Sequence, residues 1–182
     1  MPVRPIRQLG DPVLRQVAKK VRHVDANIDR LVVDMIDTVL DAPGSGLAAP
    51  QIGVPLRVLV THYEDEIDVW INPELAWRSE ETEVHEEGCL SIKGYAGPVE
   101  RSLGVEVRGL NRKGKKARIR AEDWLARILQ HEIDHLNGIL YIDHIADKRM
   151  IHPADEDVEV EDNDSPDLLD REAADRAPVP AS

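Results

Sequence analysis

One predicted helix, over residues 122–137, constrains the fold of this chain more than any other feature. Its apolar residues recur at helical spacing and form a single stripe, which a protein core has to cover. The stripe consists of Leu125, Ile128, Leu129, Ile133 and Leu136. Glu132 falls in the middle of this stripe, and a carboxylate on a core-facing line is costly unless it is paired or takes part in chemistry. The pattern predicts a central helix with a functional carboxylate on its buried side.

The same helix carries a His-Glu-x-x-His motif at residues 131–135. His131 and His135 are four residues apart, so both imidazoles lie on one face and can bind one ion. Glu132 lies beside that ion and can transfer protons for a metal-activated water. A hydrolytic site takes three protein ligands and leaves one position open, so a third ligand is still required. The alternative is two surface histidines beside a salt-bridging glutamate, which the apolar setting of Glu132 disfavours.

The completions of this motif known from zinc peptidases fit the sequence poorly. One class continues to a third histidine, but that position holds Tyr141. Another class uses a downstream glutamate, and the candidates here, Glu156 and Glu159, lie in an acidic tail. A zinc endopeptidase stays open as one alternative. A binding module with a structural metal is a second, and its closed site needs a fourth ligand, for which His144 and Asp143 are nearest.

Cys89 is the only cysteine and the remaining candidate for the third ligand. It follows Gly88, which permits an unusual backbone conformation or a close approach. A lone cysteine is more often a small buried apolar residue. A single cysteine also excludes an internal disulfide, which suits a reducing compartment.

Composition indicates one domain followed by an acidic tail. The 182 residues are enough for a core, which we expect to be aliphatic because the chain has no Phe. The net charge is −12, and eleven of the 35 acidic residues lie after residue 153, against two basic ones. This balance argues against nucleic-acid binding. We expect a catalytic domain over residues 1–152 and a flexible tail over residues 153–182.

The remaining segments predict a fold with both helices and strands, and they contain no expected targeting or membrane-spanning segment. We expect a helix over residues 28–40 capped by Asp25. We expect strands over residues 57–61, 68–71, 82–87, 103–110, 116–120 and 139–142, and Asn72-Pro73 is expected to close the second of them. Residues 1–7 lack the apolar run of a signal peptide, and no segment is long and apolar enough to span a membrane. We therefore expect a cytoplasmic protein without membrane contact.

Three segments in order resemble the signature segments of the peptide deformylase family. They are Gly-Ser-Gly-Leu-Ala-Ala-Pro-Gln at residues 44–51, Glu-Gly-Cys-Leu-Ser at residues 87–91 and Gln-His-Glu-Ile-Asp-His at residues 130–135. The resemblance extends over residues 6–151. It implies an α+β fold, with mostly antiparallel sheets packed around the central metal-binding helix. It also implies an enzyme of protein biosynthesis, which hydrolyses the formyl group from N-formylmethionine at the start of nascent polypeptides and releases formate.

The resemblance assigns roles to the motif residues. Cys89, His131 and His135 would hold one divalent metal, with a water in the fourth position. Ferrous iron is implied as the native metal, and Zn²⁺, Ni²⁺ or Co²⁺ are able to substitute. Glu132 would act as general acid and base. An oxyanion would be stabilised by donors from two further residues, Gln51 and the backbone N–H of Leu90.

The resemblance also implies how the substrate binds. A substrate strand would pair with backbone near Ser45, Gly46 and Gly88, and the methionine side chain would enter an apolar pocket beside Ile128. Three features depart from the family: Ser45 replaces an aliphatic residue, residues 93–97 lack an arginine found in many relatives, and the tail is acidic. Some relatives have a basic C-terminal helix for ribosome docking, so we expect no docking through this tail.

The resemblance also leads to expectations for residues around the ligands. Glu87 and Arg101 are expected to pair and hold the Cys89 loop. For Asp134 two interpretations stay open: it steadies the helix or a ligand, or it is a solvated charge.

Overall fold

The structure is a computed structural model and describes residues 3–154. Two α-helices are present, α1 (Ala26–Asp41) and α2 (Asp123–Leu136), with short 3-10 helices at Pro12–Arg15, Ala49–Ile52, Tyr141–Asp143 and Lys148–Met150. The strands are β1 (Gly46–Ala48), β2 (Val58–Tyr63), β3 (Glu66–Arg78), β4 (Thr82–Cys89), β5 (Ile92–Ser102), β6 (Gly104–Leu110), β7 (Lys116–Glu122) and β8 (His152–Pro153). The expected tail lies outside the described residues, apart from residues 153 and 154.

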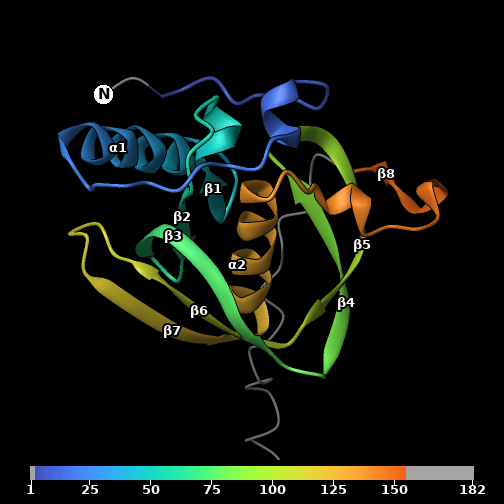
Figure 1. Ribbon diagram of the computed structural model, residues 1–182. Coiled ribbons are helices and arrows are strands. Elements are labelled where there is room, and N and C mark those ends of the chain that lie inside the picture. Colours follow the sequence, from blue (N-terminus) through green and yellow to red (C-terminus); the bar gives the residue numbers. More distant parts are fainter. Residues whose placement is uncertain (1–2, 155–182) are drawn as a thin grey trace, which may run out of the picture.

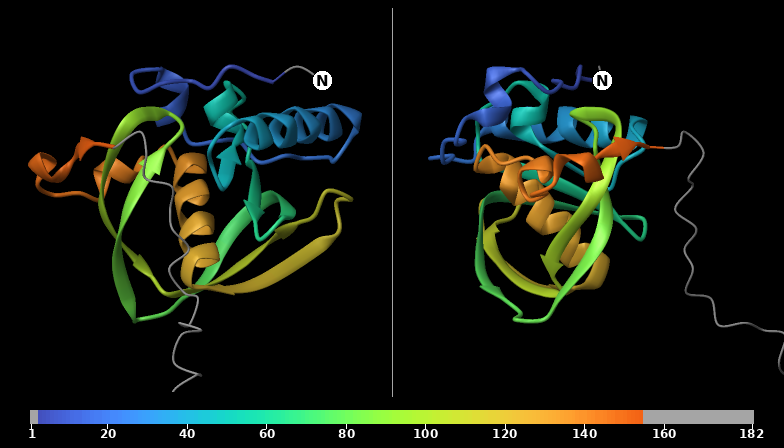
Figure 2. Two further views of the ribbon diagram at one scale, coloured as in Figure 1. Left: turned by 180° about the vertical axis from the view of Figure 1, so that it is seen from behind. Right: turned by 90° about the vertical axis from the view of Figure 1, so that its right-hand side faces the viewer.

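The strands form two antiparallel sheets with α2 between them. One sheet has the order β1-β2-β3-β6-β7, and the other has the order β4-β5-β8. Figure 1 and the rear view in Figure 2 show α2 running through the centre, with the two sheets on opposite sides. The expected α+β fold with mostly antiparallel sheets around a central helix is confirmed.

Helix α2 is central because its apolar stripe has a sheet to pack against. Leu129, Ile133 and Leu136 are buried in one cluster with residues of the five-stranded sheet, among them Leu59 and Val107. Burying a leucine side chain contributes roughly 2 kcal/mol, so burial of this face stabilises the helix against the sheet.

Helix α2 ends where the sequence supplies a glycine. Gly138 has a φ of 73°, in the left-handed region that favours glycine. A Cβ there would lie 2.7 Å from the carbonyl oxygen of Arg15.

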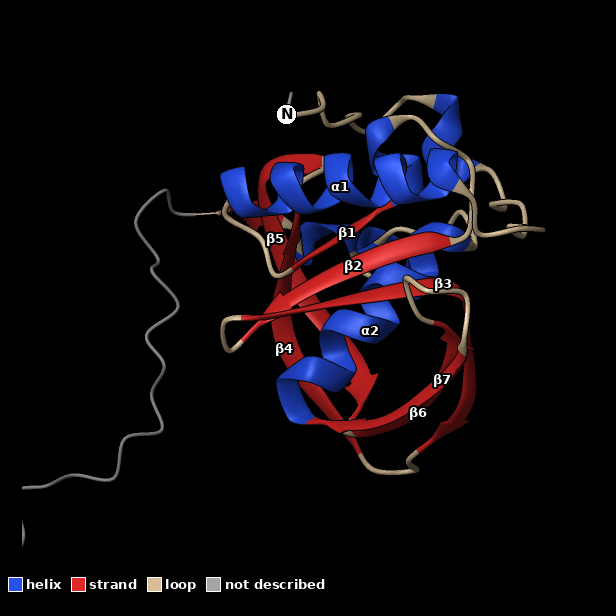
Figure 3. Cartoon of the chain, turned by 90° about the vertical axis from the view of Figure 1, so that its left-hand side faces the viewer, coloured by secondary structure: helices blue, strands red, loops and turns tan. Residues whose placement is uncertain are grey.

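Helix α1 begins where its cap was expected. The Asp25 side chain accepts hydrogen bonds from the backbone N–H groups of Asn27 and Ile28. Its apolar face packs on β1 and β2, as Figure 3 shows, with Val32, Met35 and Val39 fully buried. Both helices contact the five-stranded sheet, and β1 is in contact with each of them.

Strand β3 is longer than expected. We predicted that Asn72 and Pro73 would end it, but it continues to Arg78 through a register shift after Ile71. Asn72 has a φ of 53°, which asparagine tolerates, and its side chain bonds the backbone N–H and carbonyl of Val21 at 2.8 and 2.9 Å. The turn signal is thus a bulge within a strand.

One other expectation about local structure is wrong, and one strand was missed. Residues 139–142 form no strand; instead Tyr141–Asp143 is a 3-10 helix in which the Asp143 carboxylate accepts from the Leu140 N–H at 2.8 Å. Strand β5 was not expected, because Gly94, Gly97 and Pro98 obscure its alternation. Pairing with β4 along most of its length supplies the order that local sequence lacks.

No helix in the part of the chain that the structure describes has the length and apolarity needed to cross a membrane.

Candidate metal centre

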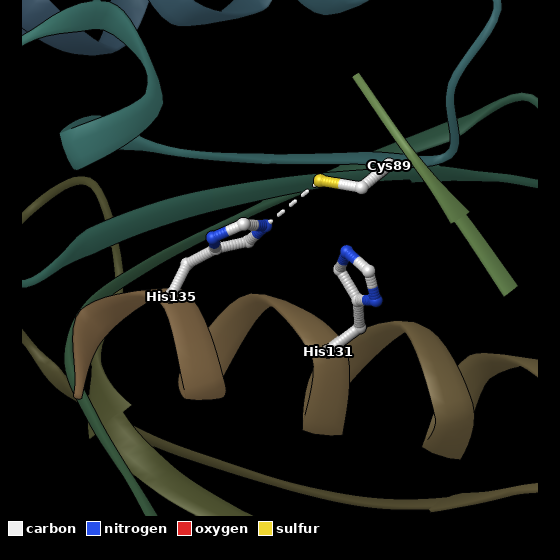
Figure 4. A group of neighbouring side chains, drawn as sticks. All are labelled: Cys89, His131 and His135. Atoms are coloured by element: carbon white, nitrogen blue, oxygen red, sulfur yellow. Dashed lines mark hydrogen bonds between the residues drawn. The ribbon is translucent and has the colours of Figure 1, made fainter. Parts of the chain in front are cut away.

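Cys89, His131 and His135 lie together, as Figure 4 shows. One ligand atom of each lies within 4.8 Å of the others, and Cys89 Sγ is 3.2 Å from His135 Nε2. Cys89 is the last residue of β4, whereas both histidines come from α2. A thiolate and two imidazoles are a donor set that first-row divalent metals bind.

The group has three members within residues 3–154. The candidates for a fourth ligand have other partners: His144 bonds Asp134 at 2.8 Å, and Asp143 pairs with Arg15. Tyr141, at the third-histidine position of the peptidase class, donates its hydroxyl to the Tyr95 carbonyl at 3.1 Å. This arrangement fits an open three-ligand site and neither alternative completion. Glu156 and Glu159 lie outside the described residues.

Two polar atoms at this site are buried without a partner within residues 3–154, and only the Glu132 oxygen is placed to gain one from a group bound there, because His135 faces Cys89 with its other ring nitrogen, Nε2. Glu132 Oε2 and His135 Nδ1 are inaccessible and have no hydrogen-bond partner among the described residues. Glu132 is only 4% exposed. Burial raises its pKa to about 6, although the neighbouring histidines oppose this shift. The predicted position of this carboxylate, on the buried side of the helix, is confirmed.

Gln51 reaches the site from the 3-10 helix after β1. It is 1% exposed, and its Oε1 accepts from the Ala48 N–H at 2.7 Å. This bond fixes the amide so that Nε2 faces Ser91 Oγ at 3.3 Å and Cys89 Sγ at 3.7 Å. Gln51 therefore presents a preorganised donor beside the sulfur.

Ser91 is a site residue to which we assigned no role from sequence. Its backbone N–H donates to Cys89 Sγ at 3.4 Å, and its hydroxyl accepts from Gln51. A thiolate is stabilised by such donors, and its pKa lies well below the usual range: burial alone would raise it, but the charges and hydrogen bonds of His135 and His131 outweigh burial. The only signal was the position of Ser91, two residues after the cysteine.

Glu87 lies behind His131 and accepts four hydrogen bonds. Arg101 donates through Nε and Nη2 at 2.9 and 3.0 Å, Arg127 at 2.8 Å, and His131 Nδ1 lies 2.9 Å away. Burial alone would raise the pKa of Glu87, but the bonds to His131 and Arg101 hold it well below its usual value. With Nδ1 occupied by a carboxylate, Nε2 of His131 is the nitrogen left to bind a metal.

Asp134 is buried, so the solvated-charge interpretation is wrong. It is 6% exposed and accepts from Arg101 Nη1 at 2.5 Å and from His144 Nε2 at 2.8 Å. Its side of α2 faces the three-stranded sheet rather than solvent. Asp134 is thereby linked through Arg101 to Glu87.

The residues expected to bind substrate lie on or near two free strand edges. Gly46 begins β1 and Gly88 is in β4, and both strands are outermost in their sheets. The Ser45 carbonyl is already occupied by the His62 N–H at 2.8 Å. Ile128, 6% exposed, lies one turn before Glu132 on the same helix face.

The expectation about Gly88 in the Cys89 loop needs revision, and the loop has one contact that was not predicted. Gly88 does not have the positive φ that favours glycine, and a Cβ there would make ordinary contact with the Tyr95 carbonyl oxygen at 3.6 Å, so neither an unusual conformation nor a close approach requires glycine here. The Leu90 carbonyl accepts from Gln8 at 3.0 Å, which anchors the loop after Cys89 to the N-terminal segment.

The fold and this site together define a metal-dependent hydrolase. Residues 3–150 match the family described as Polypeptide deformylase. A peptide deformylase of Mesorhizobium japonicum is 53% identical over 151 residues, covering 80% of this chain and 86% of the relative, and one of Rhizobium meliloti is 51% identical with 80% and 87% covered.

Solved structures agree with the sequence comparisons. The peptide deformylase of Synechococcus elongatus in complex with actinonin has a TM-score of 0.80 at 39% identity, covering 82% of each chain. That of Legionella pneumophila has a TM-score of 0.78 at 44% identity, covering 82% of this chain and 90% of its own. This chain belongs to the polypeptide deformylase family.

Proposed function

We propose that this enzyme removes the formyl group from N-formylmethionyl ends of nascent polypeptides and releases formate and a free amine. Family membership supports a metal-dependent hydrolysis of this kind. The observation that carries the proposal is a buried oxygen of Glu132, beside the Cys89, His131 and His135 group, that has no hydrogen-bond partner within residues 3–154. Because the substrate is a nascent chain, we place the reaction in the cytoplasm, without membrane or nucleic-acid binding.

Cys89, His131 and His135 are the proposed ligands of one divalent ion. Fe²⁺ is the proposed native metal, and Zn²⁺, Ni²⁺ and Co²⁺ suit the same sulfur and nitrogen donors. When bound, the metal supplies Lewis-acid chemistry at the scissile formyl group. Glu87 and Arg101 are the proposed support for this set: Glu87 holds the ring of His131, and Arg101 holds Glu87.

Glu132 is the proposed general acid and base. It takes a proton from the attacking water and delivers it to the leaving amine nitrogen. Its burial favours this role, because burial raises the pKa of a carboxyl group toward neutrality and an acid–base group works best when its pKa is close to the working pH.

Gln51 and the backbone N–H of Leu90 are the proposed oxyanion donors. Gln51 Nε2 is fixed beside the sulfur by the bond between its Oε1 and Ala48. A donor fixed before the reaction costs no reorganisation when negative charge develops on the formyl oxygen.

The substrate backbone is proposed to bind along the outer edges of β1 and β4. A strand added there reads main chain, which suits an enzyme that accepts many nascent chains. Ser45, Gly46 and Gly88 are the proposed backbone partners, and Ile128 the proposed wall of the methionine pocket. The catalytic domain is proposed to cover residues 1–152, with the tail over residues 153–182 outside the chemistry.

A substrate comparison tests this function. Protein purified without oxygen is given a formyl-Met tripeptide, and formate and free amine are measured. The matched control is the same tripeptide with an acetyl group, and an internal peptide bond tests the endopeptidase alternative. We expect equal amounts of formate and amine from the formyl peptide alone. Cleavage of the internal bond without formate would contradict the proposal.

A further inference from the structure

Arg127 is a buried arginine on α2, one turn before His131. It is 5% exposed. Its Nη1 donates to Glu87 Oε1 at 2.8 Å and to the Val99 carbonyl at 2.9 Å, and its Nη2 donates to the Glu83 carbonyl at 2.8 Å. All three acceptors belong to the hairpin of β4 and β5.

These contacts join the two elements that carry the proposed ligands. Cys89 is the last residue of β4, and His131 and His135 are on α2. The separation between Cys89 Sγ and the two imidazoles therefore depends on how the hairpin sits against the helix. Arg127 fixes the position of the hairpin against α2 by donating to backbone carbonyls on both strands of the hairpin.

Arg127 also completes a balanced set of buried charges. Glu87 and Asp134 are two buried carboxylates, and Arg101 and Arg127 are the two buried guanidinium groups that contact them. Arg101 is shared between both carboxylates, so without Arg127 the Glu87 carboxylate would be only partly compensated. An uncompensated buried charge is strongly destabilising, and the carboxylate would shift toward other donors or solvent.

We infer that Arg127 is a positioning residue, which holds the Glu87 carboxylate and the β4–β5 hairpin so that His131 and Cys89 meet around one metal. It touches neither substrate nor metal. This inference rests on the proposed ligand set of Cys89, His131 and His135.

Two variants and a matched control test the inference. Arg127→Lys keeps the charge but loses the fork that reaches three acceptors, and Arg127→Gln loses the charge as well. Arg57→Lys is the control, because Arg57 is also buried and links the C-terminal end of α2 to β3. It does so by donating to the carbonyls of Leu136 and Pro73. Metal-free proteins are titrated with Co²⁺, following the thiolate-to-cobalt absorption band, and the Kd is measured against a chelator.

We expect both Arg127 variants to raise the Kd for Co²⁺ by about 10- to 100-fold, the range for partners of metal ligands. Arg57→Lys should lower the melting temperature of the metal-free protein while the Kd stays near that of the wild type. A Kd unchanged in the Arg127 variants would overturn the inference. So would an equal rise in Arg57→Lys at the same loss of melting temperature, since Arg127 would then only stabilise the helix.

A double variant keeps the test decisive if a single variant folds poorly. If Arg127 acts through Glu87, then adding Arg127→Gln to Glu87→Gln raises the Kd by much less than it does in the wild type. Multiplicative effects would overturn the claim that Arg127 acts by holding Glu87. A wild-type protein that binds Co²⁺ without the thiolate band would instead contradict the proposed ligand set itself.

Discussion

The Glu132 carboxylate packs directly against the backbone of Gly46: a Cβ at residue 46 would lie 2.6 Å from Glu132 Oε1. The proposed acid–base group and the free edge of β1 are thereby fixed relative to each other. Only glycine permits this approach, because any other side chain would push the carboxylate away.

Gly46→Ala should therefore lower kcat by about tenfold or more, since misplacing a catalytic group by about 1 Å can cost up to 10²-fold. Metal content should stay at the wild-type level. The control is Gly104→Ala on β6, where the nearest atoms to a Cβ belong to the Trp77 and Ser79 side chains, at 3.3 Å or more. Steady-state kinetics with metal analysis check this prediction. A wild-type kcat for Gly46→Ala would show that the contact does not position Glu132.

Cys89→Ala should lower the metal content of purified protein, because the proposed ligand set loses its only sulfur. Ser91→Ala is the matched control: it removes a hydroxyl 3.3 Å from Gln51 but keeps the backbone N–H that bonds the sulfur. Elemental analysis of both variants measures metal per protein. An unchanged ratio in Cys89→Ala would remove this residue from the ligand set.

Arg101→Met should destabilise the metal-free protein by on the order of 3–5 kcal/mol, because it removes the guanidinium shared by the buried carboxylates of Glu87 and Asp134 and leaves both only partly compensated. Arg112→Met breaks the exposed pair with Asp29 and should barely change the urea midpoint. Urea unfolding of both variants checks the contrast. Equal midpoints would show that the buried cluster contributes no more than a surface ion pair.

Ending the chain after Ala154 should leave the melting temperature and kcat unchanged. Composition predicts a tail without a core of its own, and Ala154 N–H, bonded to the Gly94 carbonyl at 3.0 Å, closes the described fold. Thermal unfolding and turnover of the shortened chain test this. A large loss in either would show that the tail supports the domain.

The central helix, its buried glutamate and both histidines were predictable, because helical spacing is a local property of sequence. Cys89 was predictable for a different reason, the order of three motifs along the chain. The contacts of Arg127 and Asp134 were not, because both depend on a hairpin that approaches α2 from elsewhere in the chain. Strand β5 was hidden for a related reason: Gly97 and Pro98 break its local pattern, and only pairing with β4 orders it. Asn72 looked like a strand end because its left-handed φ serves turns and bulges equally.

Glu132→Gln tests the central claim most directly. The amide keeps the size of the side chain but cannot accept the proton, so the variant should fold and retain metal at the wild-type ratio. We expect formate release from a formyl-Met tripeptide to fall by about 10²-fold or more. A metal-loaded Glu132→Gln variant that releases formate at nearly the wild-type rate would contradict the account, because Glu132 would then not be the acid–base group.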